Sequence, residues 1–158
     1  TVVYAGDLAK PGAPDALVQT AIDAWGRLDI IVNNAGYTID APIHKMSDDA
    51  FQRMLDIHTI VPFRVIRAAA PHLREPAKKE KEEGKEVFRK VVNVTSISGT
   101  MGNAGQANDI STSASVSENV HWWPAVSSAV YCRSPYWMRT GTTAAAGMER
   151  LGITLVPA

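Results

Sequence analysis

Short apolar runs alternate with segments of helical period over residues 1–94. Thr1–Tyr4 is a β-branched and aromatic run that ends at Gly6 and Asp7, a pattern typical of a strand followed by a turn. Ile30–Val32 is apolar at successive positions, as a strand buried on both faces of a parallel sheet is, and Val91–Val94 is a further apolar run. Each of these runs predicts a strand.

Two helices are predicted between these strands. Pro14 suits the first turn of the first helix, and Gly26 is placed to end it. Ser47, Asp48 and Asp49 open the second helix, where the acids complement the helix dipole. The apolar positions expected to face the core are Leu17, Val18, Ala21, Ile22 and Trp25 in the first helix and Phe51, Met54, Leu55, Phe63 and Ile66 in the second. Alternating strands and helices predict an α/β protein, and right-handed crossovers make its sheet parallel.

Pro62 lies inside the second predicted helix. Because proline has no N–H group, it cannot donate to the carbonyl four residues earlier, which belongs to His58. We expect a bend between Leu55 and Phe63 and an unpaired, water-accessible carbonyl at His58. A bent core helix without a functional role is the simpler interpretation of this pattern.

Residues 78–86, KKEKEEGKE, form a charged segment of mixed sign. If the segment is helical, Lys78 can pair with Glu82 and Lys79 with Glu83, four residues apart. A solvated helix extension or loop is the first interpretation of this segment, and a binding surface is the second.

The overall composition narrows the function classes. Sixteen Lys and Arg balance sixteen Asp and Glu, which gives no support to an electrostatic nucleic-acid or membrane-surface binder. The single cysteine, Cys132, excludes an internal disulfide and fits a reducing compartment. No apolar run is long enough to span a bilayer, and we expect no signal peptide, because the N-terminus lacks a basic region followed by an apolar stretch. Because the sequence starts at Thr1 inside an apolar run, we expect its beginning to be missing, and we expect a cytoplasmic location with an organelle as the alternative.

The composition changes near residue 108. No lysine follows Lys90, residues 109–134 are rich in serine, and Trp122, Trp123 and Trp137 lie in the tail. We expect residues 1–108 to form one α/β unit and residues 109–158 to be a divergent tail of unclear structure.

Two polar motifs follow consecutive predicted strands. Asn33–Gly36, NNAG, comes directly after the first apolar strand, and Asn93–Gly99, NVTSISG, ends the next. Ligands of open α/β sheets bind beyond the carboxyl ends of the strands, where small residues let the backbone approach a cofactor. Either motif alone could be a polar turn, but the pair predicts a site at one sheet edge that includes Ser96.

These motifs resemble the short-chain dehydrogenase/reductase family, and most closely its 3-oxoacyl-(acyl-carrier-protein) reductase branch. The resemblance covers residues 1–108: GDL at Gly6–Leu8, the helix to Trp25, LDIIVNNAG, the helix through Phe63, and SISGTMGNAGQAN at Ser96–Asn108. It implies a partial Rossmann-like doubly wound parallel sheet between two helical layers, an NAD or NADP cofactor, and a small carbonyl or acyl-thioester substrate. We expect no metal at the site, and the composition favours neither a nucleic-acid nor a membrane partner.

The resemblance also implies roles for individual residues. Asp7 and Leu8 match the pair that holds the adenine ring, and Asn34, Ala35 and Gly36 match the backbone floor beside the adenine-side ribose. Ser96 matches the serine that hydrogen-bonds the substrate carbonyl. His58 stands where the family has a catalytic asparagine, which acts through its main-chain carbonyl on a relay water. A direct catalytic imidazole is the alternative role for His58.

The chain departs from the family pattern at several essential positions. Asp109 and Ser113 occupy the places of the family's catalytic tyrosine and of the lysine four residues later, and no YxxxK motif follows. The glycine-rich turn that binds the cofactor pyrophosphate is missing, since the TGTTAAAGM segment with Gly141 and Gly147 has neither its spacing nor that of a P-loop. In the strand order 3-2-1-4-5-6, Thr1–Tyr4 corresponds to strand three, whose ladder partner, strand two, is absent.

These observations leave two classes of function open. The first is an NAD(P)H-dependent oxidoreductase of which this sequence is a partial or mis-assembled copy, inactive as written. The second is a non-catalytic interaction or nucleotide-binding protein on a reductase-derived scaffold, with the tail tryptophans as a recognition surface. Family members are homo-oligomers that pair through the helix at residues 49–70 and the next one, and the next one is not recognisable here.

Overall fold

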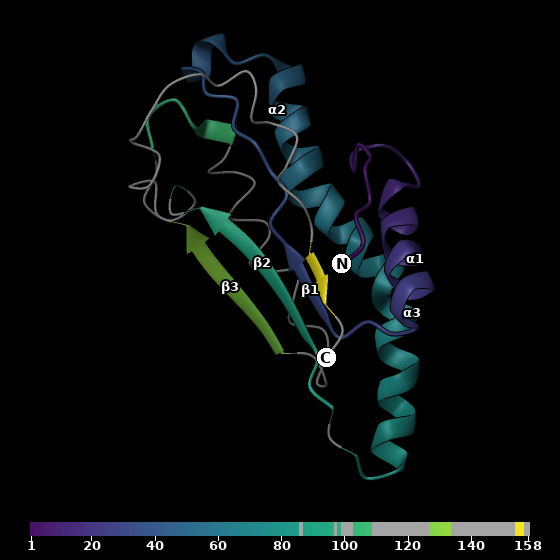
Figure 1. Ribbon diagram of the computed structural model, residues 1–158. Helices are drawn as coiled ribbons and strands as arrows, with labels where there is room; N and C mark the ends of the chain where they lie inside the picture. Colours follow the sequence, from purple (N-terminus) through teal and green to yellow (C-terminus); the bar gives the residue numbers. More distant parts are fainter. Residues whose placement is uncertain (86, 97, 99–102, 109–126, 134–153, 157–158) are drawn as a thin grey trace.

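The structure is a four-stranded sheet with helices packed beside it (Figure 1). The computed structural model describes residues 1–85, 87–96, 98, 103–108, 127–133 and 154–156. In chain order the elements are α1 (Ala13–Trp25), β1 (Ile30–Asn33), the 3₁₀ turn η1 (Ile43–Lys45), α2 (Asp48–Leu55), the π-helical turn η2 (Asp56–Ile60), α3 (Val61–Glu82), β2 (Lys90–Ser96), β3 (Ser127–Arg133) and β4 (Thr154–Val156).

The strands lie in the order β3-β2-β1-β4. β1 and β2 are parallel, with Ile30 opposite Lys90 and Asn33 opposite Asn93, and β3 is parallel to β2. The predicted parallel sheet is therefore confirmed for these strands. β4 differs, because it pairs with the other edge of β1 in the antiparallel direction. Two strands of the sheet thus come from residues 109–158, so the sheet is not confined to the α/β unit expected for residues 1–108.

The predicted strand at Thr1–Tyr4 is wrong. These four residues have no regular secondary structure, and Val3 is 82% exposed. A strand needs a neighbour to pair its backbone N–H and C=O groups. Among the described strands, none pairs with Thr1–Tyr4, so the β-branched composition alone does not make a strand here.

The helix ends follow the predicted local chemistry. Pro14 lies in the first turn of α1, and Gly26 ends the helix with a φ of 69° while its N–H donates to the Ile22 carbonyl at 2.7 Å. The Ser47 hydroxyl caps α2 by accepting from the Ala50 N–H at 3.2 Å. Both predicted helix starts are confirmed.

A π-helical turn lies where a bend near Pro62 is predicted. α2 ends at Leu55, and α3 begins only at Val61, after the turn η2. Within this turn the Val61 N–H donates to the Asp56 carbonyl, five residues earlier, which is the π-helical pattern. Phe63, predicted to face the core, is instead 51% exposed and lies under the guanidinium of Arg67 at 5.2 Å.

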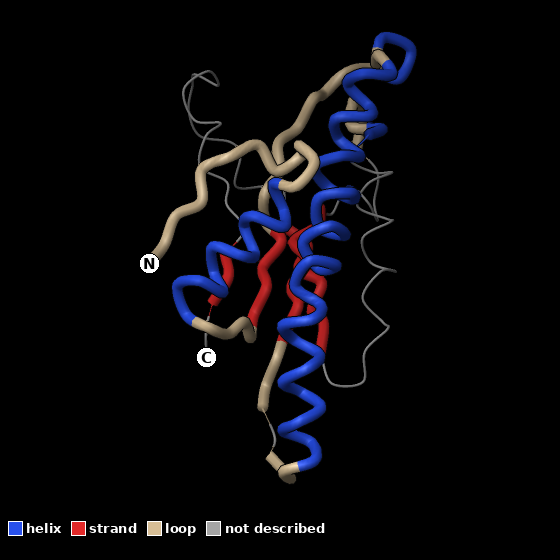
Figure 2. Tube along the Cα trace, turned by 90° about the vertical axis from the view of Figure 1, so that its right-hand side faces the viewer, coloured by secondary structure: helices blue, strands red, loops and turns tan. Residues whose placement is uncertain are grey.

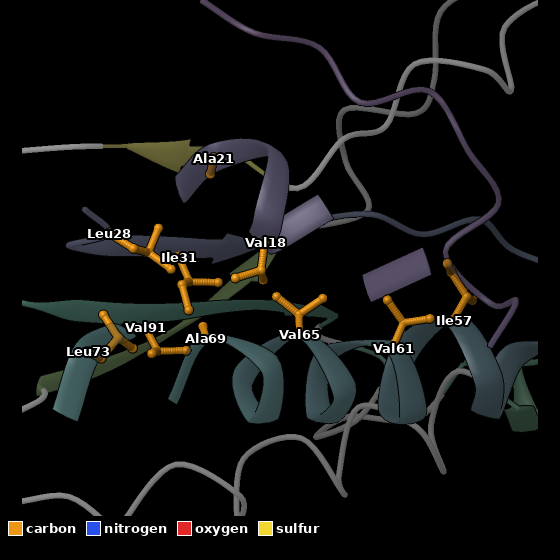
Figure 3. Packing of buried hydrophobic residues seen from close by; sticks show 10 residues of the cluster. All are labelled: Val18, Ala21, Leu28, Ile31, Ile57, Val61, Val65, Ala69, Leu73 and Val91. Atoms are coloured by element: carbon orange, nitrogen blue, oxygen red, sulfur yellow. The ribbon is translucent and has the colours of Figure 1, made fainter. Parts of the chain in front are cut away.

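α1 and α3 lie on the same face of the sheet (Figure 2), and one hydrophobic core joins them to it (Figure 3). Its buried members are Val18, Ala21, Leu28, Ile31, Ile57, Val61, Val65, Ala69, Leu73 and Val91. The described helices cover one face of the sheet, so this part of the chain has two layers of the three expected. Ile31 is accordingly buried, whereas Ile30 and Val32 on the other face of β1 are only half-buried.

Of the helix extension or loop predicted for the charged segment, the structure has the helix as far as Glu82, but the ion pairs differ. Lys78 pairs with Glu75 at 3.2 Å rather than with Glu82. Glu80 reaches out of the helix to the buried Arg89, whose guanidinium donates two hydrogen bonds of 2.6 and 2.8 Å to the carboxylate.

Candidate functional site

The carboxyl ends of β1 and β2 lie at the same end of the sheet. Because Asn33 is opposite Asn93 in a parallel ladder, Asn34 and Ser96 both leave their strands at this end, as predicted. The loop that contains Asp7 is near, since it leads into α1, which runs back toward the start of β1 (Figure 1). Leu8 packs against the core, and the Arg64 side chain donates to the Ala9 carbonyl at 3.2 Å. We call this end of the sheet, with these loops, the strand-end region.

Asp7 is exposed and organises its own turn. One carboxylate oxygen accepts from the Ala9 N–H at 3.0 Å, and the Asp7 carbonyl accepts from the Lys10 N–H at 3.1 Å. The carboxylate is therefore held in place while it faces solvent.

The first asparagine of the NNAG motif has a structural role that the sequence did not indicate. The buried Asn33 donates its side-chain amide to the Asn93 side-chain oxygen at 2.8 Å across the β1–β2 ladder. The Asn33 side-chain oxygen is buried and has no hydrogen-bond partner among the described residues. This pair could have been predicted from the sequence, because Asn33 and Asn93 each stand near the end of an apolar strand, and the two strands are consecutive.

His58 packs directly on the NNAG loop. Its Nε2 lies 2.8 Å from the Tyr37 carbonyl, so that this nitrogen carries the proton and donates. The ring occupies the space in which a side chain on Gly36 would stand. The Tyr37 ring is tilted against the imidazole, with ring centroids 6.4 Å apart. The guanidinium carbon of Arg53 lies over the Tyr37 ring, 5.8 Å from its centroid. The sequence predicted that His58 belongs to the site, but it did not predict that the imidazole contacts the NNAG loop.

Ser96 is part of a polar cluster that the sequence analysis did not predict. Its hydroxyl oxygen accepts from the Ser98 N–H at 3.2 Å, and the Ser98 hydroxyl donates to the Gln106 side-chain oxygen at 2.9 Å. Gln106 in turn donates to both carboxylate oxygens of Asp40, at 3.3 and 3.4 Å. Residues 103–108 are thus joined to the loop that leaves the NNAG motif.

Among the described residues, Arg27, Glu80 and Arg89 have shifted pKa values, and they lie at the opposite, amino end of the strands. Hydrogen bonds from Arg89 lower the pKa of Glu80, and the same contact raises the pKa of Arg89. Arg27 binds Asp29 through two hydrogen bonds of 2.7 Å, and Asp29 lies 4.0 Å from Arg89. This charged cluster ties the starts of β1 and β2 to α3 and is separate from the strand-end region.

Several predicted features lie outside the described residues. They are Asp109, Ser113, Trp122, Trp123, Trp137, Gly141 and Gly147. In the described part of the chain, no group of three or more His, Cys, Asp or Glu residues could hold a metal ion. None of the helices in that part is long and apolar enough to cross a membrane.

A mixed, mostly parallel sheet with helices on one face and polar loops at its strand ends defines an α/β protein. The short chain dehydrogenase family model matches residues 1–117. The chain therefore belongs to the short-chain dehydrogenase/reductase family of oxidoreductases.

Individual relatives agree with this assignment. The chain is 39% identical over 107 residues to the hydroxyacyl-CoA dehydrogenase ChsB1 of Mycobacterium tuberculosis, covering 68% of this chain and 33% of that protein. It is 40% identical over 94 residues to a peroxisomal hydratase-dehydrogenase-epimerase of Neurospora crassa, covering 60% of this chain and 9% of the relative. A crystal structure of a short chain dehydrogenase from Mycobacterium avium superposes with a TM-score of 0.69 at 27% identity, over 87% of this chain and 48% of that one. The chain thus spans a third or less of these two curated relatives.

Proposed function

We propose that the chain represents part of an NAD(P)H-dependent oxidoreductase that interconverts 3-oxoacyl and 3-hydroxyacyl thioesters. The observation that supports this most is the parallel register of β1 and β2, which brings the NNAG loop and Ser96 to one end of the sheet. The names of the relatives support a thioester substrate, since two of them are a hydroxyacyl-CoA dehydrogenase and a hydratase-dehydrogenase-epimerase. A carrier-protein thioester, expected from the resemblance, and a coenzyme A thioester share the same reacting group.

Ser96 is proposed to bind the substrate. Its hydroxyl is half-buried at the end of β2, and its oxygen already accepts from the Ser98 N–H. The hydroxyl hydrogen is therefore turned away from that amide and can donate to a carbonyl oxygen, where negative charge develops during reduction. When bound, the nicotinamide would supply the hydride for the carbonyl carbon.

The adenine half of the cofactor fits the residues that are present. Asp7 offers a fixed, solvent-facing carboxylate, and Leu8 is held beside it by core packing. The backbone of Asn34, Ala35 and Gly36 is proposed as the floor next to the ribose. The pyrophosphate half does not fit, because the sequence has no glycine-rich turn of the family spacing.

We propose that His58 acts through its main chain. The N–H of its imidazole already donates to the Tyr37 carbonyl, and the ring packs on Gly36, which makes it a structural support of the loop. Its carbonyl cannot receive the usual bond from Pro62 and is the proposed holder of a relay water.

The 158-residue chain itself is proposed to be inactive. Asp109 stands where the family has its proton-donating tyrosine, and a carboxylate that is ionised at neutral pH has no proton to give. Loss of proton donation alone lowers rates by roughly 10²–10⁴-fold. Restoring Asp109→Tyr and Ser113→Lys together is not expected to be sufficient, because the pyrophosphate site would still be missing.

The proposed function is tested by separating cofactor binding from turnover. Saturation-transfer NMR with adenosine monophosphate should show contact that Asp7→Asn weakens and that Asp15→Asn, an exposed change in the first turn of α1, leaves unchanged. In a second assay, NADPH absorbance is followed in the presence of an acetoacetyl thioester. The 158-residue chain should show no turnover, whereas a full-length relative assayed in parallel should consume NADPH. Turnover within about tenfold of that relative would contradict the proposed inactivity. Absence of any adenosine contact would contradict the proposed cofactor site.

We also propose a cytoplasmic location, as the single cysteine suggests, with the peroxisome as the alternative because one relative is named a peroxisomal enzyme. Microscopy of the tagged full-length protein distinguishes the two compartments. A homo-oligomer through the helix at residues 49–70 is the proposed assembly, and the mass of the protein in solution tests it.

A further inference from the structure

The side chain of Gln106 is the centre of a hydrogen-bond cluster between three segments of the chain. Its oxygen accepts from the Ser98 hydroxyl at 2.9 Å and from the Asn103 side-chain amide at 2.7 Å. Its nitrogen donates to the Asp40 carboxylate at 3.3 and 3.4 Å. An amide suits this place because it offers an acceptor on one side and donors on the other.

The backbone holds both ends of this cluster in place. The Ala41 N–H donates to the Gly105 carbonyl at 2.9 Å, and Ala41 and Gln106 form a parallel bridge. The fully buried Asn108 donates its side-chain amide to the Ile39 carbonyl at 2.8 Å. Asp40 therefore stands between two cross-links that fix it relative to Gln106.

The cluster reaches Ser96 through Ser98. Ser98 is almost completely buried, and its N–H donates to the Ser96 hydroxyl oxygen. When Gln106 fixes the Ser98 hydroxyl, it also restricts the position from which the Ser98 N–H can donate. The direction of this N–H decides where the Ser96 hydroxyl hydrogen can point.

We infer that Gln106 is a positioning residue for Ser96, acting through Ser98 and held in orientation by Asp40. This inference rests on the proposed substrate-binding role of Ser96 and adds to it the residues that orient the hydroxyl. Gln106 itself does not contact Ser96, so its effect is on hydroxyl orientation and not on the reacting atoms.

The first experiment tests the cluster without any ligand. Gln106→Glu places a second carboxylate against Asp40 and should release the cluster, and the double variant Asp40→Asn/Gln106→Glu should restore it because the new asparagine can donate to the new carboxylate. The measurement is the ¹H–¹⁵N shift and hydrogen exchange of the Ser98 amide. We expect exchange about tenfold faster in the single variant, as loss of one hydrogen bond gives, and near-original exchange in the double variant.

Gln19→Glu is the matched control. Gln19 also donates to a carboxylate, that of Asp23 at 2.7 Å, but on the exposed face of α1. This variant makes the same chemical change and should leave the Ser98 amide unaltered. The inference would be overturned if the Ser98 amide exchanged equally fast in the wild-type chain and in Gln106→Glu while circular dichroism showed both proteins to be folded.

The second experiment links the cluster to the substrate. A ¹³C-labelled ketone in acetoacetyl-pantetheine should shift downfield when it accepts a hydrogen bond from Ser96. Gln106→Glu should reduce this shift, Asp40→Asn/Gln106→Glu should recover it, and Ser96→Ala should abolish it. If the wild-type chain shows no shift, the proposed function fails, while the Ser98 amide still decides whether the cluster orients Ser96.

Discussion

Gly36 and His58 pack together because Gly36 has no side chain. A Cβ at this position would overlap with Cε1 of the imidazole and lie 3.0 Å from its Nδ1. The same ring is fixed by the hydrogen bond from Nε2 to the Tyr37 carbonyl at 2.8 Å. The NNAG loop and the π-helical turn η2, which carries His58, therefore constrain each other.

Gly36→Ala is expected to destabilise the chain by about 1–3 kcal/mol, the usual cost of overpacking a fitted site. The added methyl group displaces the imidazole and so breaks its bond to the Tyr37 carbonyl. The midpoint of urea unfolding measures the loss.

The double variant Gly36→Ala/His58→Ala separates the steric cause from other effects. Because removal of the ring makes room for the methyl group, the two losses should be clearly less than additive. Additive losses would show that the ring is not what Gly36 accommodates.

The buried pair of Asn33 and Asn93 gives a second prediction. Asn93→Ala should cost about 1–3 kcal/mol, because the Asn33 amide then loses its acceptor in a buried place. The double variant Asn33→Leu/Asn93→Leu should lose less stability than Asn33→Leu or Asn93→Leu alone, since no polar group of the pair is then left unpaired. A double variant that is less stable than both single variants would contradict this account.

The pH dependence of stability is predicted from the contact of Glu80 with Arg89. Since the folded chain holds the pKa of Glu80 below its ordinary value of 4.5, the folded state binds fewer protons than the unfolded state in acid. The pair thus stabilises the fold above this value, and the contribution is lost as the pH falls through the folded pKa.

Glu80→Gln should lower the free energy of unfolding at neutral pH by about 1.5–3 kcal/mol, the usual value of a hydrogen bond to a charged group. It should also flatten the decline of stability as the pH falls below 4.5, the ordinary pKa of this group. Glu75→Gln is the control, because the ion pair of Glu75 with Lys78 is exposed. A variant that loses stability with acid as steeply as the wild type would contradict the prediction.

The pairing of β4 with β1 gives a further prediction. Removal of residues 154–158 leaves the edge of β1 without a neighbour, so hydrogen exchange of the β1 amides that face β4 should become faster. Amides of β1 that face β2 should keep most of their protection. No change in exchange at Ile30–Val32 would show that β4 does not protect this edge.

The sequence predicts a structural element well when the residues that cause it to form lie within the element itself. Ile30–Val32 and Val91–Val94 were recognisable as strands because their apolar runs carry the signal themselves. Thr1–Tyr4 has a strand-like composition but lacks the required neighbour. Composition alone does not show this, whereas the family strand order already indicated that the ladder partner is absent.

The same limit applies to the candidate site. Asn34 and Ser96 were placed at one end of the sheet because parallel strands share a direction. Gln106 and Asn108, in contrast, lie 66 and 69 residues from their partners Asp40 and Ile39. No local pattern predicts which partner so distant in the sequence a polar side chain will meet, and only the folded register brings them together.

The antiparallel pairing of β4 also has a consequence for the order of folding. Val156 is the partner of Ile30, so one edge of β1 can form only after residue 156 has been synthesised. Pairing over such a long separation in the sequence costs loop-closure entropy before any bond is gained, which slows folding. Between the synthesis of β1 and that of β4, this edge of β1 therefore has no partner and is available to other extended segments.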